Sequence, residues 1–134
     1  MSYILLVEDN PEHAELVVRI LKSQSYRVKH ASRATIGLAM VRQECPSLIL
    51  MDLNLPDMSG EMAVRVIRQQ LGNRMPPIVA VTAYDDGVHR QSAKQVGCRA
   101  FIAKPVSPQE LLHTARYFLE EDNHDADLTL VRRP

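Results

Sequence analysis

The chain has 134 residues, a length that suits one domain and is short for a two-domain enzyme. Its 16 basic and 16 acidic residues balance, which argues against a broad nucleic-acid-binding surface or a membrane-binding patch. No apolar run approaches the roughly 20 residues of a membrane span, and the N-terminus does not have the pattern of a secretory signal. We therefore expect a cytoplasmic globular protein in which Cys45 and Cys98 are free thiols.

Short apolar runs alternate with longer stretches of helical period, which is typical of βαβ units around a parallel sheet. The first strand is expected at 4–8, and Pro11 suits the first turn of the helix that follows. A weaker second strand is expected at 27–31. Ser32 is a candidate cap for the second helix, and Pro46 would stop that helix.

The third and fourth strands are expected at 48–52 and 78–82. Both are apolar on both faces, as central strands of a parallel sheet should be. A turn-forming string at 54–60 separates the third strand from a helix at about 61–70. After the fourth strand, a helix is expected near 89–96.

The fifth strand is expected at 100–103, and Ser107 followed by Pro108 opens the last helix. We therefore expect a single domain over residues 1–121. The polar stretch 122–134 breaks the pattern. It is expected to be a tail that is disordered, forms a short strand or begins a truncated linker.

Polar side chains stand where four of the expected strands end: Glu8, Asp9, Asp52, Thr82 and Lys104. The carboxyl ends of parallel strands meet at one edge of the sheet, and ligands bind there. We therefore expect three carboxylates, a hydroxyl and an ammonium to lie close together, although they are far apart in the sequence.

Each of these residues also has an ordinary structural explanation. Asp9 could cap the first helix, and Asp52 could begin an Asx turn. Thr82 could simply end its strand, and Lys104 could be a solvated surface charge. The coincidence of all of them at matching strand ends favours a functional site.

Three carboxylates in one place repel each other unless a hard divalent cation screens them, and Mg²⁺ prefers oxygen ligands. The five histidines do not have the spacing of a zinc site. Beside Mg²⁺, Asp52 could attack phosphorus and form an acyl phosphate. Lys104 and Thr82 would then bind the phosphoryl oxygens. The pattern predicts a magnesium-assisted phosphoryl-transfer site.

Over residues 3–120 the chain resembles the receiver domain of two-component response regulators, of the kind found in the bacterial chemotaxis regulator. Four motifs carry the resemblance, in order and at family-like distances: 7–10, 50–60, 81–83 and 101–105. The resemblance implies an α/β fold of the flavodoxin-like (βα)5 type. In this fold a doubly wound, five-stranded parallel sheet has the strand order 2-1-3-4-5.

The resemblance also implies the role of each site residue. Asp52 is the phosphoacceptor, Thr82 and Lys104 bind the phosphoryl group, and Mg²⁺ is held by Glu8, Asp9, Asp52 and the backbone carbonyl of Asn54.

Four positions would modulate this chemistry. Thr82 and Phe101 would form the switch of the family, although Phe101 could also be just an inward-facing strand residue. Asn54 and Tyr84, each two residues beyond a site residue, would tune the lifetime of the phosphoryl group. The family's Lys-Pro bond, here between Lys104 and Pro105, is commonly cis.

The expected function is that of a phosphoprotein in a two-component pathway or phosphorelay, which takes a phosphoryl group from a histidine kinase or a histidine phosphotransfer protein. Its face around the fourth helix, fifth strand and fifth helix would then change its binding to a downstream protein. The protein would not be an enzyme beyond its own phosphorylation and dephosphorylation, and no direct DNA binding is expected. Two alternatives remain: a receiver excised from a hybrid kinase or longer regulator, and a Mg²⁺-dependent aspartyl phosphatase.

Overall fold

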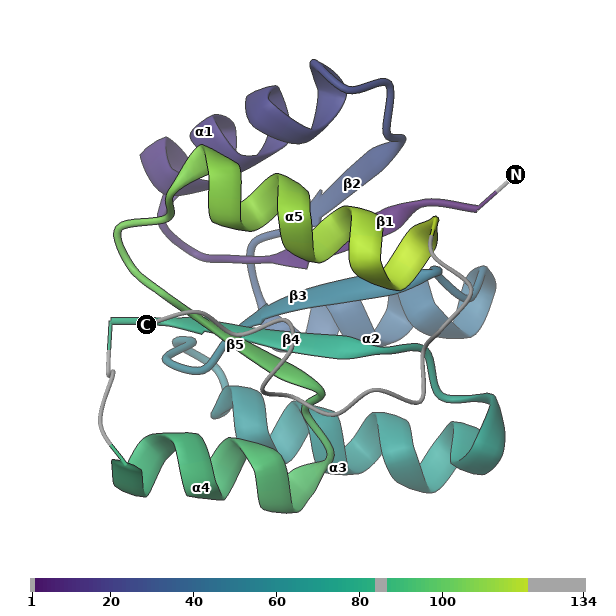
Figure 1. Ribbon diagram of the computed structural model, residues 1–134. Coiled ribbons are helices and arrows are strands. Elements are labelled where there is room, and N and C mark those ends of the chain that lie inside the picture. The colour runs from purple at the N-terminus through teal and green to yellow at the C-terminus, as the bar shows by residue number, and fades with distance from the viewer. Residues whose placement is uncertain (1, 84–86, 121–134) are drawn as a thin grey trace.

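The computed structural model describes residues 2–83 and 87–120. Tyr84 and the expected tail 122–134 lie outside the described residues. Five strands alternate with five α-helices, and a short 3-10 helix follows the third of them (Figure 1). The elements are β1 (Ile4–Val7), α1 (Pro11–Lys22), β2 (Val28–Ala31), α2 (Ala34–Gln43), β3 (Leu48–Asp52), α3 (Gly60–Leu71), η1 (Gly72–Arg74), β4 (Ile78–Thr82), α4 (Gly87–Val96), β5 (Ala100–Ala103) and α5 (Pro108–Leu119).

The strands form one parallel sheet in the order β2-β1-β3-β4-β5, so the predicted fold class is confirmed. The central strands β1, β3 and β4 are buried along their whole length. Their side chains can be apolar on both sides because helices cover both faces of the sheet. In the described part of the chain, no helix combines the length and the hydropathy that crossing a bilayer requires.

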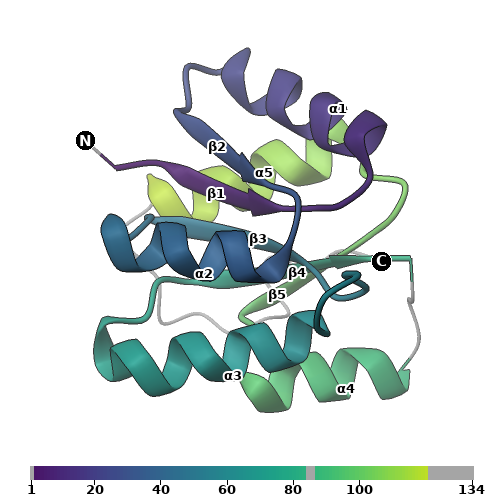
Figure 2. The same cartoon turned by 180° about the vertical axis from the view of Figure 1, so that it is seen from behind.

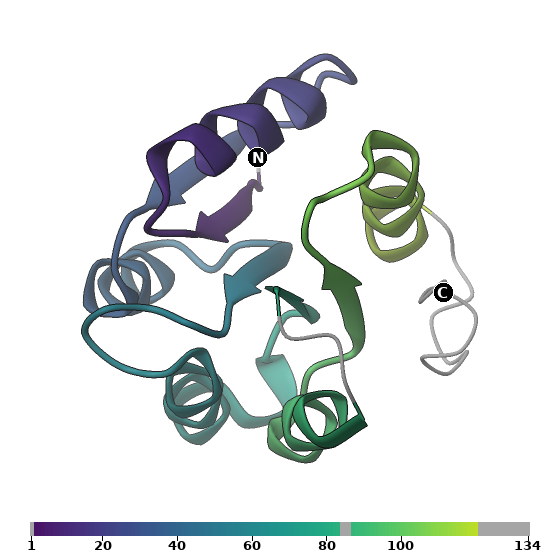
Figure 3. The same cartoon turned by 90° about the vertical axis from the view of Figure 1, so that its left-hand side faces the viewer.

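The two faces of the sheet have separate apolar cores. Helices α1 and α5 cover one face, and α2, α3 and α4 cover the other (Figures 2 and 3). Successive residues of a strand point to opposite faces, so Leu5 packs toward α2 and α3 while Leu6 packs toward α1 and α5. With the helices fixed on both faces, the carboxyl ends of the strands are left at one edge of the molecule.

The helices begin at caps that hydrogen-bond their first backbone N–H groups. Asn10 accepts hydrogen bonds from two backbone N–H groups of α1, and Ser59 caps α3. Ser107 caps α5 with Pro108 in its first turn, as predicted. These contacts fix the helix starts, and α1 and α3 start beside the edge where strands β1 and β3 end.

The predicted cap of α2 is wrong. Arg33, not Ser32, is the residue before the helix, and its side chain makes no capping hydrogen bond. Instead, the carboxylate of Asp57 accepts hydrogen bonds from the backbone N–H groups of Ala34 and Thr35, both at 3.0 Å. Hydrogen bonds from the backbone at Thr35 and Ala34 lower the pKa of Asp57 to about 2. A distant carboxylate thus does what a local hydroxyl was expected to do.

Strands β3, β4 and β5 have the predicted boundaries, and several other elements differ from theirs by one or two residues. Helix α4 starts at Gly87, two residues earlier than expected, and β2 starts at Val28 rather than at residue 27.

Both cysteines are free, as predicted. Cys45 is exposed, whereas Cys98 is buried and its pKa is raised to about 12, mainly by burial and also by the charge of Glu61.

Candidate functional site

The polar strand ends meet where the order of the strands reverses. From β1 the chain passes to β2 on one side, and from β2 it crosses to β3 on the other side of β1. Open α/β sheets bind ligands at such a switch point. Glu8 and Asp9 follow β1, and Asp52 is the last residue of the neighbouring β3. Topology therefore brings together carboxylates that are 43 and 44 positions apart.

Three carboxylates form one group at this edge. Glu8, Asp9 and Asp52 each offer an oxygen atom, and these atoms all lie within 4.8 Å of one another. Glu8 and Asp52 are buried, while Asp9 is exposed. Because every donor is a carboxylate oxygen and one side is open to solvent, the group fits Mg²⁺, which takes oxygen ligands and keeps several waters.

Lys104 reaches both buried carboxylates from the end of β5. Its Nζ lies 2.9 Å from Oε1 of Glu8 and 3.2 Å from Oδ2 of Asp52. Burial lowers the pKa of Lys104, but the hydrogen bonds and charges of both carboxylates outweigh burial and raise this pKa above its usual value. Lys104 is therefore no solvated surface charge, and that explanation is wrong. Its peptide bond to Pro105 is cis.

The two buried carboxylates have opposite pKa shifts. Burial raises the pKa of Asp52 to about 6, and the nearby charge of Glu8 adds to this rise. Burial also acts on Glu8, but hydrogen bonds from Lys104 and from the backbone of Asn10 outweigh it and hold the pKa of Glu8 below its usual value. Asp52 thus carries most of the electrostatic cost of the group, which a bound cation would relieve.

The loop after Asp52 is packed tightly against the end of β3. The backbone N–H of Asn54 donates to Oδ1 of Asp52 at 3.0 Å, so the Asx turn considered for Asp52 is present as well. At Gly60, the first residue of α3, a Cβ atom would lie 2.4 Å from the carbonyl oxygen of Asp52 and 2.7 Å from Cα of Leu53. Only glycine fits there, and the close approach of its backbone to that of Asp52 fixes the start of α3.

Thr82 and Phe101 lie on β4 and β5, on the other side of β3 from Glu8. Thr82 ends β4 and is completely buried. Phe101 is also buried, in the core beneath α4, and the guanidinium of Arg90 lies 5.0 Å from the centre of its ring. The inward-facing position expected for Phe101 is therefore present. Tyr84, the other residue expected near Thr82, lies outside the described residues.

Two histidines near Glu8 were missed from the sequence. Nδ1 of His13 lies 2.9 Å from Oε1 of Glu8, and Nε2 of His30 lies 2.7 Å from the backbone oxygen of Glu8. Asn10, not Asp9, caps α1, so the capping explanation for Asp9 is wrong. His13 is the third residue of the helix that follows this cap, and a side chain at that position can reach back toward the cap. This spacing is the one sequence signal that could have indicated the position of His13.

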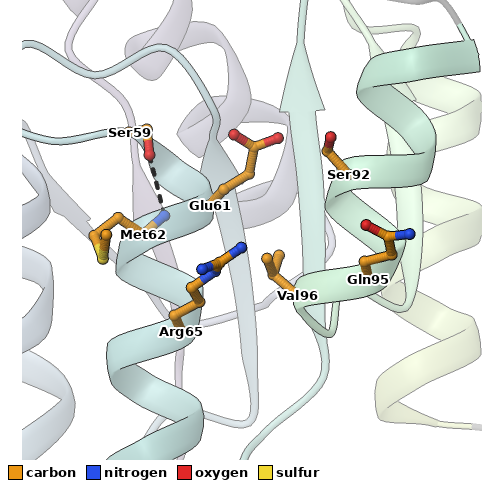
Figure 4. A pocket seen from close by; sticks show the side chains of 7 residues that line it. All are labelled: Ser59, Glu61, Met62, Arg65, Ser92, Gln95 and Val96. Atoms are coloured by element: carbon orange, nitrogen blue, oxygen red, sulfur yellow. Dashed lines mark hydrogen bonds between the residues drawn. The ribbon is translucent and has the colours of Figure 1, made fainter.

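A separate pocket lies between α3 and α4, with a volume of about 270 Å³ (Figure 4). Its lining is mostly polar: Ser59, Glu61, Met62, Arg65, Ser92, Gln95 and Val96. None of the three clustered carboxylates belongs to this lining, so the pocket is not the acidic site.

Comparisons with known proteins agree with this geometry. Residues 4–116 match the response regulator receiver domain family. Protein PilH of Pseudomonas aeruginosa is 31% identical over 114 residues, which cover 85% of this chain and 94% of PilH.

Two solved structures resemble the whole fold. The receiver domain of sensor histidine kinase PA1611 from Pseudomonas aeruginosa has a TM-score of 0.82 at 32% identity, covers 90% of this chain and 98% of its own, and contains a magnesium ion in its active site cleft. The receiver domain of Ssk1 from Saccharomyces cerevisiae, solved with the histidine phosphotransfer protein Ypd1, has a TM-score of 0.82 at 25% identity and covers 87% of this chain and 88% of its own. With four-fifths of its length matched by one family pattern, the chain belongs to the response regulator receiver domain family of two-component signalling.

Proposed function

We propose that this protein is a phosphoryl-accepting response regulator in which Asp52 is the phosphoacceptor. One observation carries the proposal: Asp52 is only 3% exposed, ends the central strand, and shares its site with two further carboxylates and the ammonium of Lys104. A buried carboxylate beside two other carboxylates lowers the stability of the folded protein. A catalytic use of Asp52 accounts for the arrangement.

The phosphoryl donor in this proposal is a phosphohistidine on a histidine kinase or a phosphotransfer protein. An oxygen of Asp52 forms a bond to phosphorus while the P–N bond breaks, and the leaving imidazole keeps the electron pair and takes up a proton. The ammonium of Lys104 and the hydroxyl of Thr82 bind the oxygens of the transferred group. The solved complex of Ssk1 with a phosphotransfer protein supports this type of partner, and such a partner favours a cytoplasmic location.

Mg²⁺ fits the oxygen-only donor set of the site. Glu8, Asp9, Asp52 and the backbone carbonyl of Asn54 would hold it, and its charge would offset the repulsion between the carboxylates and the incoming phosphoryl group. The related receiver of PA1611, which contains magnesium in its cleft, supports the choice of metal.

Output would pass through the β4–β5 side of the site. In the proposal, Thr82 is drawn toward the phosphoryl group, and Phe101 and the face formed by α4, β5 and α5 respond by changing the binding of a downstream protein. Asn54 and Tyr84 would adjust the lifetime of the acyl phosphate.

The similarity to the receiver of a sensor kinase also favours a second candidate, a receiver that works within a longer protein with the same chemistry. Asn54, which stands where an aspartyl phosphatase has its second aspartate, argues against the enzyme alternative.

The test is phosphorylation by a small phosphodonor, such as acetyl phosphate, with Mg²⁺. Mass spectrometry should detect one added phosphoryl group that is labile to base, as an acyl phosphate is. Asp52→Asn should abolish the modification completely. Asp57→Asn, the same change at an exposed carboxylate of the following loop, should keep it. Modification that persists in Asp52→Asn, on a hydroxyl or on another carboxylate, contradicts the assignment.

A further inference from the structure

The buried carboxylate of Glu8 contacts three polar groups of the protein, in addition to the metal ion that it would bind. Its side chain is fully buried and accepts hydrogen bonds on both oxygens. Nζ of Lys104 donates to Oε2 at 3.1 Å and also approaches Oε1, and the backbone N–H of Asn10 donates to Oε2 at 3.1 Å. His13 supplies the remaining contact, at 2.9 Å from Oε1.

The ring of His13 is directed at Glu8. An ionised carboxylate can only accept, so Nδ1 of His13 carries the proton and donates it. The His13 side chain is 13% exposed, and its other ring nitrogen, Nε2, is buried without a hydrogen-bond partner among the described residues. Glu8 is therefore the polar group that holds this imidazole in place within the described part of the chain.

The partners of Glu8 differ in how firmly they stay with it. In the function proposed above, the ammonium of Lys104 binds the phosphoryl oxygens on Asp52, so it has to give up part of its contact with Glu8. A buried carboxylate that loses its charged partner becomes costly and tends to reorient. His13 sits in the first turn of α1, whose start is fixed by Asn10, and its bond to Glu8 does not involve the phosphoryl group.

We propose that His13 is a positioning residue, which holds the Glu8 carboxylate in its metal-binding orientation whether Lys104 contacts Glu8 or the phosphoryl group. The inference rests on the proposed function, because it assigns His13 to the same site. It predicts that His13 acts through the hydrogen bond from Nδ1, and that its loss weakens the binding of Mg²⁺ before any phosphoryl transfer.

The experiment measures Mg²⁺ binding by calorimetry for wild type, His13→Leu and His13→Asn at constant ionic strength. The amide N–H of Asn can occupy the position of Nδ1–H, whereas Leu has no donor. Removal of a group that orients a metal ligand commonly weakens metal affinity by about tenfold or more, and this is the loss expected for His13→Leu. His13→Asn should stay within about threefold of wild type. His113→Leu, the same change at an exposed histidine of α5, should bind as wild type does.

A repeat with beryllium fluoride, which mimics the phosphoryl group on an aspartate, tests the second half of the inference. His13→Leu should need a higher fluoride-complex concentration for half-saturation than His13→Asn. If wild type binds no Mg²⁺, the proposed function itself is wrong. If wild type binds Mg²⁺ and His13→Leu binds it equally well, or if His13→Asn loses as much as His13→Leu, only the role of His13 is wrong. Should His13→Leu not fold, His13→Ala, which adds no bulk beside the carboxylate, carries the same expectation.

Discussion

Helices α3 and α4, which follow β3 and β4 on the same face of the sheet, each begin with a glycine, and the surroundings of the two glycines differ sharply. At Gly60 of α3, a side chain would collide with the backbone of Asp52 and Leu53. At Gly87 of α4, an added Cβ would meet no described atom within 4 Å. The start of α3 is fixed against the backbone of Asp52, whereas no described atom crowds the start of α4.

The bodies of the two helices show the same difference. Four residues of α3 are buried, against two of α4, namely Ala93 and Val96. At the start of α4, Val88 is 75% exposed. A helix that buries few apolar side chains opens or shifts at a lower free-energy cost. Asp52 therefore lies against the firmly packed helix, and in the proposed function the loosely packed α4 is the helix suited to respond to phosphorylation.

The largest expected effect is that of Gly60→Ala. The new Cβ would lie 2.4 Å from a backbone oxygen, and backbone cannot move aside as a flexible side chain can. We expect the free energy of unfolding to fall by about 3 kcal/mol or more, measured by urea denaturation. Phosphorylation at Asp52 should slow in the folded fraction, because α3 and the end of β3 must separate. A loss below about 0.5 kcal/mol would show that the two junctions do not differ.

Next in size is the effect of Asp52→Asn on metal-free protein. The pKa of Asp52 is raised from 3.8 to about 6, so the folded state binds its proton more tightly than the unfolded state does. Stability from this group is present below pH 4 and lost as the pH rises through 6. Between pH 4 and 7 in EDTA, the stability of Asp52→Asn should gain on that of wild type by about 2 to 3 kcal/mol. Thermal melts of both proteins at several pH values provide the measurement. If the stabilities of the two proteins change in parallel with pH, ionised Asp52 does not destabilise the metal-free fold.

A smaller effect of opposite sign is expected at Asp57. Its pKa is lowered to about 2 because it accepts hydrogen bonds at the start of α2. The stability it contributes is present above its unfolded pKa, near 3.8, and lost as the pH falls through 2. Asp57→Ala should therefore lower the melting temperature at pH 7, and the difference from wild type should shrink below pH 4. A pH-independent difference would mean that the carboxylate charge is not what caps α2.

The smallest expected effect is that of Gly87→Ala. No described atom would lie within 4 Å of the new Cβ, and the position is helical, so alanine should reduce the entropy of the unfolded chain without strain. We expect a gain of about 0.4 to 1 kcal/mol in the free energy of unfolding, with phosphorylation at Asp52 unchanged. A clear destabilisation would reveal close packing at the start of α4 and break the contrast with Gly60.

The sequence predicts the fold well because its signals are local. Fully apolar strands such as 48–52 and caps such as Ser107 depend on neighbouring residues alone, and they appear where expected. The carboxyl-edge cluster follows from parallel topology, which needs only the order of strands and helices.

What could not be predicted depends on contacts between distant segments. Ser32 has the right chemistry for a cap, but Asp57, 23 positions away from Ala34, takes its place, and no local pattern announces such a contact. His13 lacks any zinc-like spacing, and its role emerges only when the end of β1 places Glu8 against the first turn of α1. The opposite pKa shifts of Glu8 and Asp52 likewise depend on how strongly Lys104 and backbone N–H groups stabilise the charge of each carboxylate.

Because Cys45 is exposed and Cys98 is buried, thiol reagents should modify the protein at Cys45 only. Alkylating reagents and mild oxidants act on exposed thiols that can form a thiolate. Cys98 meets neither condition, since it is buried and its pKa is raised to about 12, whereas Cys45 is exposed. Cys45 lies just before β3, at the opposite end of this strand from Asp52. A maleimide fluorophore should therefore attach at Cys45 alone and give this tryptophan-free chain an optical signal without touching its acidic edge.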